Sequence, residues 1–342
     1  MTPTEPSATG GPSAPPRVRR YGMTVPFDKV PLHAQRDLVV ELADLGYTDL
    51  WSAEADGADA FTPLALASVW APTLRLGTAI VPAFTRGPAC LAQSVGSLAQ
   101  AAPGRFVFGI GASSDVIVER WNGIPFDRPY QRVRDTVRFL RTALTGEKVR
   151  ERYETFEVQG FRLGVVPPEP VPILVAALRE GMLRLAGREA DGAIVNWLSA
   201  DDVTRVAPIV RSFGPGPDGA EKEIVARIFV APGVDAETAR GFGRFAIAAY
   251  LNVPVYAAFH EWLGRGDRLA GMWARWKEGD RKGALGEIPD SVVDELIVHG
   301  PPEACREHVQ RYVEAGVTTP ALAILPFPGV EPSRAIRDLA PR

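Results

Sequence analysis

Short apolar runs alternate with helical patterns of hydrophobic residues along most of this chain, and the alternation is regular enough to count. In the segments between the runs, leucines and valines recur at helical spacing, as in residues 32–46 and 130–144, which predicts helices. Eight strands, each followed by a helix, predict a (β/α)₈ TIM barrel. The eight predicted strands are Tyr21–Val25, Thr48–Ala53, Leu74–Val81, Phe106–Ile110, Pro172–Ala177, Ala193–Asn196, Ile224–Val230 and Ala321–Leu325.

A doubly wound parallel sheet is the alternative fold. Continuous apolar runs such as Ile173–Ala177 suit strands that are buried on both faces, which either fold requires. A doubly wound fold of this size commonly carries a phosphate-binding glycine fingerprint after its first strand, but the loop here, PFDKVP, has no glycine. The pattern therefore favours the barrel.

Two stretches are longer than a minimal barrel needs. Residues 146–170, after the fourth strand, alternate as in a short hairpin, and residues 250–290, after the seventh, are helical and rich in aromatic residues. Long loops after barrel strands commonly cover the active site. We expect residues 1–19, which have no apolar run, to form a disordered tail, and residues 20–342 to form a single TIM-barrel domain.

Composition excludes several classes of function. Of the 342 residues 46% are hydrophobic, and the net charge of −3 predicts no attraction to nucleic acid or to an anionic membrane. No apolar run is long enough to predict a transmembrane helix, and the two distant cysteines fit a cytoplasmic protein. The four histidines show no metal-binding spacing, so we expect no metal, and no GxSxG motif supports a hydrolase.

Three strand ends carry candidate functional residues. The fourth strand ends in Gly109 and Gly111, which would let backbone approach a ligand, although taken alone they fit a flexible turn better. The fifth leads through Arg179 into a helix, whose free amides could bind a phosphate or could belong to an ordinary capped helix. The second places Glu54 at the catalytic face, where it could also be a solvated loop acid.

The segments LRLGTAIVPAFTRGPACLAQSVGSLAQAAPGRFVFGIG and PILVAALREGMLRLAGREADGAIVNWLS resemble the bacterial luciferase-like superfamily. Within it they are most similar to the coenzyme F420-dependent oxidoreductase branch, which includes methylenetetrahydromethanopterin reductase. The resemblance extends from about residue 20 to residue 326.

This resemblance implies a site for the cofactor. A non-prolyl cis peptide on the third strand, under the isoalloxazine-type ring, matches the bond between Ala79 and Ile80. The loop that holds the cofactor phosphate matches residues 177–182, with Asn196 nearby. The cofactor-binding residues implied in this way are Ala79, Ile80, Gly111, Ala112, Ser113, Ala177, Leu178, Arg179, Glu180, Gly181, Met182 and Asn196.

The sequence departs from its relatives at the groups that handle protons. A histidine that often follows the acid of strand two is replaced by Ala55, and glutamates found in some reductases fall at Thr24 and Ser114. Glu54 therefore remains as the candidate for general acid or for substrate positioning. Trp51, Trp121 and Trp197 could line the pocket or could simply pack.

The expected function is hydride transfer between the C5 atom of F420 and a small organic substrate. An FMN-dependent monooxygenase, supplied with reduced flavin by a partner reductase, is the first alternative. A flavin- or deazaflavin-binding protein without turnover is the second, because the proton-transfer residues are missing. Relatives are commonly dimers, so we expect a homodimer.

Overall fold

The computed structural model describes residues 20–216 and 219–341, so the predicted disordered tail, residues 1–19, lies outside the described residues. Eight parallel strands form a closed barrel, since β12 pairs with β1 and also with β10. The predicted (β/α)₈ TIM barrel is therefore confirmed. Its strands are β1 (Gly22–Val25), β2 (Asp49–Ser52), β3 (Arg75–Thr78), β5 (Phe106–Gly111), β8 (Ile173–Ala176), β9 (Gly192–Asn196), β10 (Glu223–Pro232) and β12 (Thr319–Ile324).

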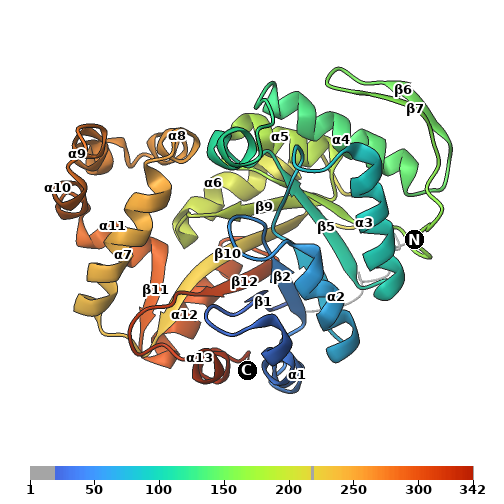
Figure 1. Cartoon of the computed structure of the whole chain (residues 1–342). Coiled ribbons are helices and arrows are strands. Elements are labelled where there is room, and N and C mark those ends of the chain that lie inside the picture. Colours follow the sequence, from blue (N-terminus) through green and yellow to red (C-terminus); the bar gives the residue numbers. More distant parts are fainter. Residues whose placement is uncertain (1–19, 217–218, 342) are drawn as a thin grey trace, which may run out of the picture.

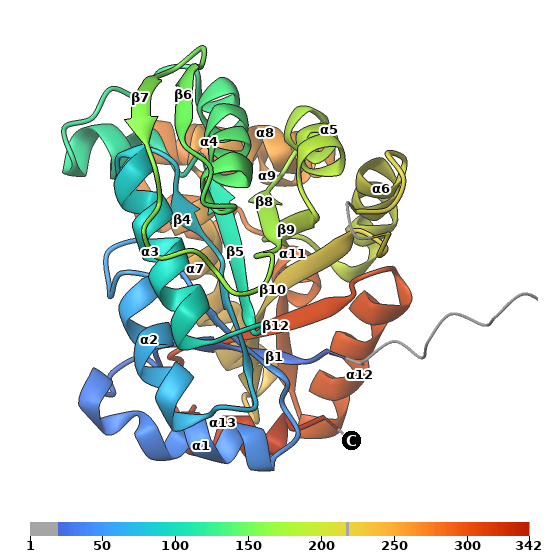
Figure 2. The same ribbon diagram turned by 90° about the vertical axis from the view of Figure 1, so that its right-hand side faces the viewer.

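Helices surround this barrel (Figures 1 and 2). Local sequence starts several of them: proline at the first turn opens α3, α4 and α12, and the Ser199 side chain forms a capping box with Asp202 at the start of α6. The surrounding helices are α1 (Arg36–Asp44), α2 (Phe61–Trp70), α3 (Pro88–Ala101), α4 (Pro129–Ala143), α5 (Glu180–Glu189), α6 (Ala200–Arg211), α7 (Ala236–Leu251), α12 (Pro302–Glu314) and α13 (Pro332–Asp338), with a 3₁₀ turn at Leu32–Ala34 and a π-helix at Val116–Trp121.

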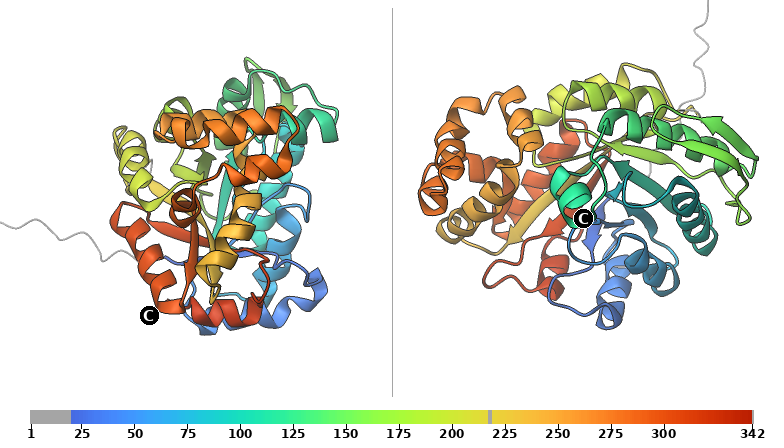
Figure 3. Two further views of the ribbon diagram at one scale, coloured as in Figure 1. Left: turned by 90° about the vertical axis from the view of Figure 1, so that its left-hand side faces the viewer. Right: turned by 45° about the horizontal axis from the view of Figure 1, so that its top comes forward.

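Both predicted insertions are present. After α4, β6 (Val149–Arg152) and β7 (Glu157–Phe161) form an antiparallel hairpin beside that helix (Figure 2). After α7 come α8 (Pro254–Trp262), α9 (Gly266–Lys277), α10 (Arg281–Gly286) and α11 (Asp290–Leu296). These orange elements lie together at one side of the barrel in Figures 1 and 3. None of the helices within the described ranges is both long and apolar enough to cross a membrane.

Two strands differ from the sequence prediction. The third predicted run is split into β3 and β4 (Val81–Pro82), and the peptide between Ala79 and Ile80 in the gap is cis, as the resemblance implies. The strand β11 (Ile297–Gly300) was not predicted; it pairs with residues Phe229–Pro232, at the end of β10. Because Phe229 and Val230 also pair with β12, β10 is held on both edges there.

The barrel interior is filled in two layers below its carboxyl end. Asp49, Arg75 and Glu223 form buried ion pairs near the strand starts. Above them Trp51, 1% exposed, packs in a cluster with apolar residues of five other strands. A Cβ atom on Gly22 or Gly77 would come within 2.8 Å of the Trp51 ring, so these glycines make room for it. The other cluster members are Val107, Leu174, Ile194, Val225 and Ala321.

Candidate active site at the barrel mouth

Small residues form a shelf where β3, β4 and β5 end. Ala79, Ile80, Ala112 and Ser113 are all partly exposed there. Gly111 lies against Ile80, because a Cβ on Gly111 would lie 3.1 Å from the Ile80 Cδ1 atom and 2.8 Å from the Ala176 Cβ atom. The structure thus brings these five predicted site residues together. A shelf with such short side chains leaves room for a flat ring.

Gly109 has a different role from the one that its sequence position suggests. A Cβ atom on Gly109 would lie 1.9 Å from the carbonyl oxygen of Thr78, and the Gly109 amide donates to the Thr78 hydroxyl at 2.8 Å. That hydroxyl in turn donates to the Gly109 carbonyl at 2.9 Å. The glycine therefore admits the neighbouring β3 backbone, and the expectation that it admits a ligand is wrong.

The predicted phosphate loop ends at the start of α5, next to the shelf, since β5 and β8 are paired strands. Arg179 is the N-cap residue and no side chain caps the helix. Arg179 and Gly181 are exposed, and no atom lies within 4 Å of the position that a Gly181 Cβ would take. Free amides and an exposed guanidinium suit an anion at this place. Of the remaining loop residues, Ala177 is buried, Leu178 and Met182 are half-buried, and Glu180 pairs with Arg184 at 2.6 Å.

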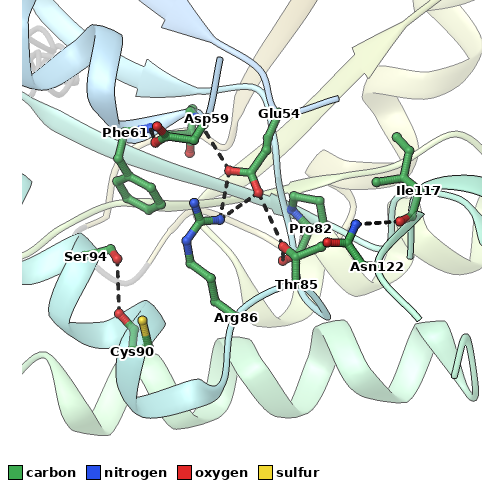
Figure 4. A network of polar contacts seen from close by, with 12 residues as sticks. Glu54, Asp59, Phe61, Pro82, Thr85, Arg86, Cys90, Ser94, Ile117 and Asn122 are labelled. Atoms are coloured by element: carbon green, nitrogen blue, oxygen red, sulfur yellow. Dashed lines mark hydrogen bonds and ion pairs between the residues drawn. The ribbon is translucent and has the colours of Figure 1, made fainter. Parts of the chain in front are cut away.

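Glu54 follows β2 and is held by an arginine from the loop after β4 (Figure 4). Both carboxylate oxygens accept from the Arg86 guanidinium, at 2.7 and 2.8 Å. Longer bonds come from the Thr85 hydroxyl and the Ala60 amide, both at 3.3 Å. The Arg86 guanidinium also lies 5.1 Å from the centre of the Phe61 ring. With its lone pairs committed in this way, Glu54 is better suited to positioning Arg86 than to donating a proton.

Asn196, at the end of β9, forms hydrogen bonds with a residue that the sequence analysis did not single out. Its amide nitrogen donates to the Tyr256 hydroxyl of α8 at 3.1 Å, so the helical insertion reaches the barrel mouth. Burial raises the pKa of Tyr256 to about 12, with smaller lowering effects from the Asn196 bond and the charge of Arg227. Arg227 of β10, beside Asn196 in the strand register, was also missed. A lone arginine inside the apolar run IVARIFV was the available signal.

The three candidate tryptophans have separate environments. Trp51 fills the interior, and Trp197 is buried against Phe229, with 4.1 Å between ring centres. Trp121 is 56% exposed on the π-helix. Thr24 lines a cavity at the mouth, whereas Ser114 accepts the Ile117 amide at the start of the π-helix. Among residues 20–216 and 219–341, no group of three His, Cys, Asp or Glu side chains could hold a metal ion.

His260, on α8, is expected to make the helical insertion sensitive to acid. Burial, with a further contribution from Arg265, lowers the pKa of this fully buried histidine to about 3. In the unfolded chain this histidine takes up a proton near pH 6.5, whereas in the folded protein it stays neutral down to about pH 3. The free energy of unfolding is therefore unaffected by His260 above pH 6.5 and decreases as the pH falls from there towards 3. We expect His260→Phe, measured by urea unfolding between pH 4 and 7.5, to flatten this dependence. His33→Gln, at an exposed site, is the control and should leave the pH dependence as it is; a slope unchanged by His260→Phe would contradict the prediction.

Comparison with known proteins places this barrel in a family. The family model described as luciferase-like monooxygenase matches residues 2–319. A 5,10-methylenetetrahydromethanopterin reductase of Archaeoglobus fulgidus is 27% identical over 289 residues, covering 82% of this chain and 86% of the relative.

Two solved structures share the fold. The coenzyme F420-dependent tetrahydromethanopterin reductase from Methanopyrus kandleri has a TM-score of 0.77 and 18% identity, with 94% of this chain and 97% of that chain covered. A type II Baeyer–Villiger monooxygenase from Pseudomonas putida, in complex with FMN, has a TM-score of 0.65 and 13% identity, with 94% and 97% covered. The family match spans nearly the whole barrel, and this chain therefore belongs to the luciferase-like monooxygenase family.

Proposed function

We propose that this protein is an F420-dependent oxidoreductase that transfers a hydride between the cofactor and a small organic substrate. The observation that carries the proposal is the placement, on neighbouring strands, of a shelf of small residues and the uncapped start of α5. These features fit a flat ring with a phosphate-bearing tail. The relationship to an archaeal methylenetetrahydromethanopterin reductase supports F420 as the cofactor.

The residues of the chain have distinct roles in this proposal. Ala79, Ile80, Gly111, Ala112 and Ser113 support one face of the ring, so that the other face meets substrate. Residues 177–182 bind the phosphate through the α5 amides and Arg179, and Asn196 lies at the adjoining strand end. Glu54 holds the Arg86 side chain in place at the barrel mouth. When bound, F420 supplies the hydride chemistry at its C5 atom.

FMN is the alternative cofactor, because a structural neighbour contains it. Titration of tryptophan fluorescence with F420 and with FMN in parallel separates the two. We expect F420 to bind and FMN to bind far more weakly. Tight FMN binding without F420 binding would overturn the proposal, and bound F420 that no acceptor oxidises would indicate a binding protein without turnover.

The phosphate subsite has its own variant. Gly181→Asp places a carboxylate beside the α5 amides in open space, and Gly181→Ala is the uncharged control. We expect Gly181→Asp to weaken F420 binding about tenfold or more through charge repulsion, and Gly181→Ala to leave it unchanged. A deazaflavin riboside without phosphate should bind both variants equally. Equal F420 affinity of the two variants would argue against a phosphate at this helix.

A further inference from the structure

A second feature of the barrel mouth lies away from the shelf, between the ends of β1 and β12. A cavity of about 210 Å³ is lined by Thr24 of β1, Arg227 of β10 and Ala323 of β12. That volume is large enough for a small organic molecule. Ala323 lies on the strand between the other two, and its short side chain leaves the space between them open.

Arg227 brings a positive charge to this cavity with no negative partner. No ion pair or hydrogen bond from its guanidinium to another described residue is found, and its Nε atom is buried. The nearest aromatic contact is the Phe229 ring, whose centre lies 5.2 Å from Cζ. Neighbouring Tyr256 has its pKa raised to about 12 by burial, so it stays neutral and does not serve as a counter-ion. A buried N–H of a charged group without a partner is costly, which favours an anionic ligand.

Thr24 offers a second donor at the same cavity. Its hydroxyl is buried and has no hydrogen-bond partner within the described chain. A guanidinium and a hydroxyl that both lack partners and line one small cavity form a donor set for a carboxylate. The donors are on β10 and β1, so the barrel itself fixes their positions.

The rim of the cavity limits the charge of the ligand. Asp28 and Glu331 are exposed carboxylates there, and Lys29 is an exposed cation. Two rim carboxylates disfavour a phosphate dianion or a polycarboxylate. A monocarboxylate can place its single charge at Arg227, with its uncharged part towards the shelf.

We propose that Arg227 and Thr24 bind the carboxylate of a small monocarboxylic acid substrate. The inference rests on the proposed function, because it makes this acid the partner of the hydride transfer. The hydride would move between the C5 atom of F420 and a carbonyl or alcohol carbon of the acid, with the proton on the alcohol oxygen exchanged with solvent, while the carboxylate stays unchanged. Arg227 determines substrate class, while the shelf and the α5 start hold the cofactor.

Isothermal titration of the full chain with benzoate and pyruvate, each beside its neutral amide, tests the subsite without any turnover. We expect each acid to bind about tenfold or more tightly than its amide, as a charge-assisted pair predicts. Arg227→Gln should abolish that preference, and Arg227→Lys, which keeps the charge, should retain part of it. Thr24→Val should weaken binding of the acid but not of the amide. Arg162→Gln, on the exposed hairpin side of the molecule, is the control and should leave both affinities unchanged.

F420 binding to the same variants separates this inference from the proposed function. We expect Arg227→Gln to bind F420 like the parent protein. Equal affinity for acid and amide overturns the subsite while leaving F420 binding intact. Loss of F420 binding in both Arg227 variants, without loss of acid binding, assigns Arg227 to the cofactor and also overturns it. Failure of the parent protein to bind F420 overturns the proposed function instead.

Discussion

Replacing Gly109 with alanine is expected to lower the free energy of unfolding by about 3 kcal/mol or more, because the new methyl group has no room. It would lie 1.9 Å from the Thr78 carbonyl oxygen and 2.4 Å from the Ile194 Cδ1 atom. The isoleucine side chain can rotate away, but the carbonyl belongs to β3 and moves only with that strand. The paired hydrogen bonds between Gly109 and Thr78 would be lost in the same movement.

Chemical denaturation of Gly109→Ala beside Gly241→Ala gives the measurement. Gly241 lies within α7 and has nothing within 4 Å of its would-be Cβ, so alanine there should raise stability by about 0.5–1 kcal/mol. If Gly109→Ala were as stable as the parent protein, β3 would have to move aside at little cost, and the prediction would be wrong.

The second large effect is expected at Arg75. Arg75 pairs with Asp49 and donates to Glu223 at 2.6 and 3.0 Å, with side chains 11%, 1% and 18% exposed respectively. Arg75→Met leaves two carboxylates in the barrel floor with Arg20, at 3.7 Å from Asp49, as their remaining cationic neighbour among the described residues. Breaking a buried ion pair by removing one partner costs about 3–5 kcal/mol.

This loss should depend on pH. Burial raises the pKa of Glu223, but the charge and hydrogen bonds of Arg75, with a bond from Thr319, outweigh burial and lower it. In the parent protein this gives stability that is present at neutral pH and lost as the pH falls through the folded pKa. Without Arg75 the burial effect dominates, so the variant gains stability as Glu223 is protonated. The difference in free energy of unfolding between the parent protein and Arg75→Met should therefore be largest near pH 7 and become smaller towards pH 4.

Neutralising the acids checks this cause. Asp49→Asn and Glu223→Gln, added to Arg75→Met, should recover a large part of the lost stability at pH 7, since no uncompensated charge is then buried. A combined variant no more stable than Arg75→Met alone would place the loss in packing against Trp51, whose ring centre lies 5.4 Å from the Arg75 Cζ atom.

The eight barrel strands were predictable because a parallel strand covered on both faces must be apolar along its length. Strand β11 was not predictable, because Ile297–Gly300 follows α11 directly and its few apolar residues continue the helical pattern. The interruption between β3 and β4 was implied by the resemblance and not by hydrophobicity, because the two residues of the gap, Ala79 and Ile80, are apolar like Val81 after them.

Some site residues could likewise be predicted from the sequence and others could not. Residue types at strand ends pointed to Gly111 and to the α5 start, because a barrel gathers those ends at one rim, whereas Ala79 and Ile80 were implied only by the resemblance. The partners of a side chain depend on distant segments, so neither the Glu54–Arg86 pair nor the Asn196–Tyr256 bond followed from spacing. For Gly109 the sequence left a ligand contact and a flexible turn open, because sequence alone does not distinguish a small residue that admits a ligand from one that admits a neighbouring strand.

The tryptophan that fills the barrel has a consequence for the path of substrate and product. Trp51 closes the interior above the ion pairs of the barrel floor, so small molecules do not pass through the barrel between its two ends. Under the proposed function, substrate therefore enters, and product leaves, at the carboxyl ends of the strands. A cofactor bound on the β3–β5–β8 side would have to leave the β1–β12 side of this rim open for both.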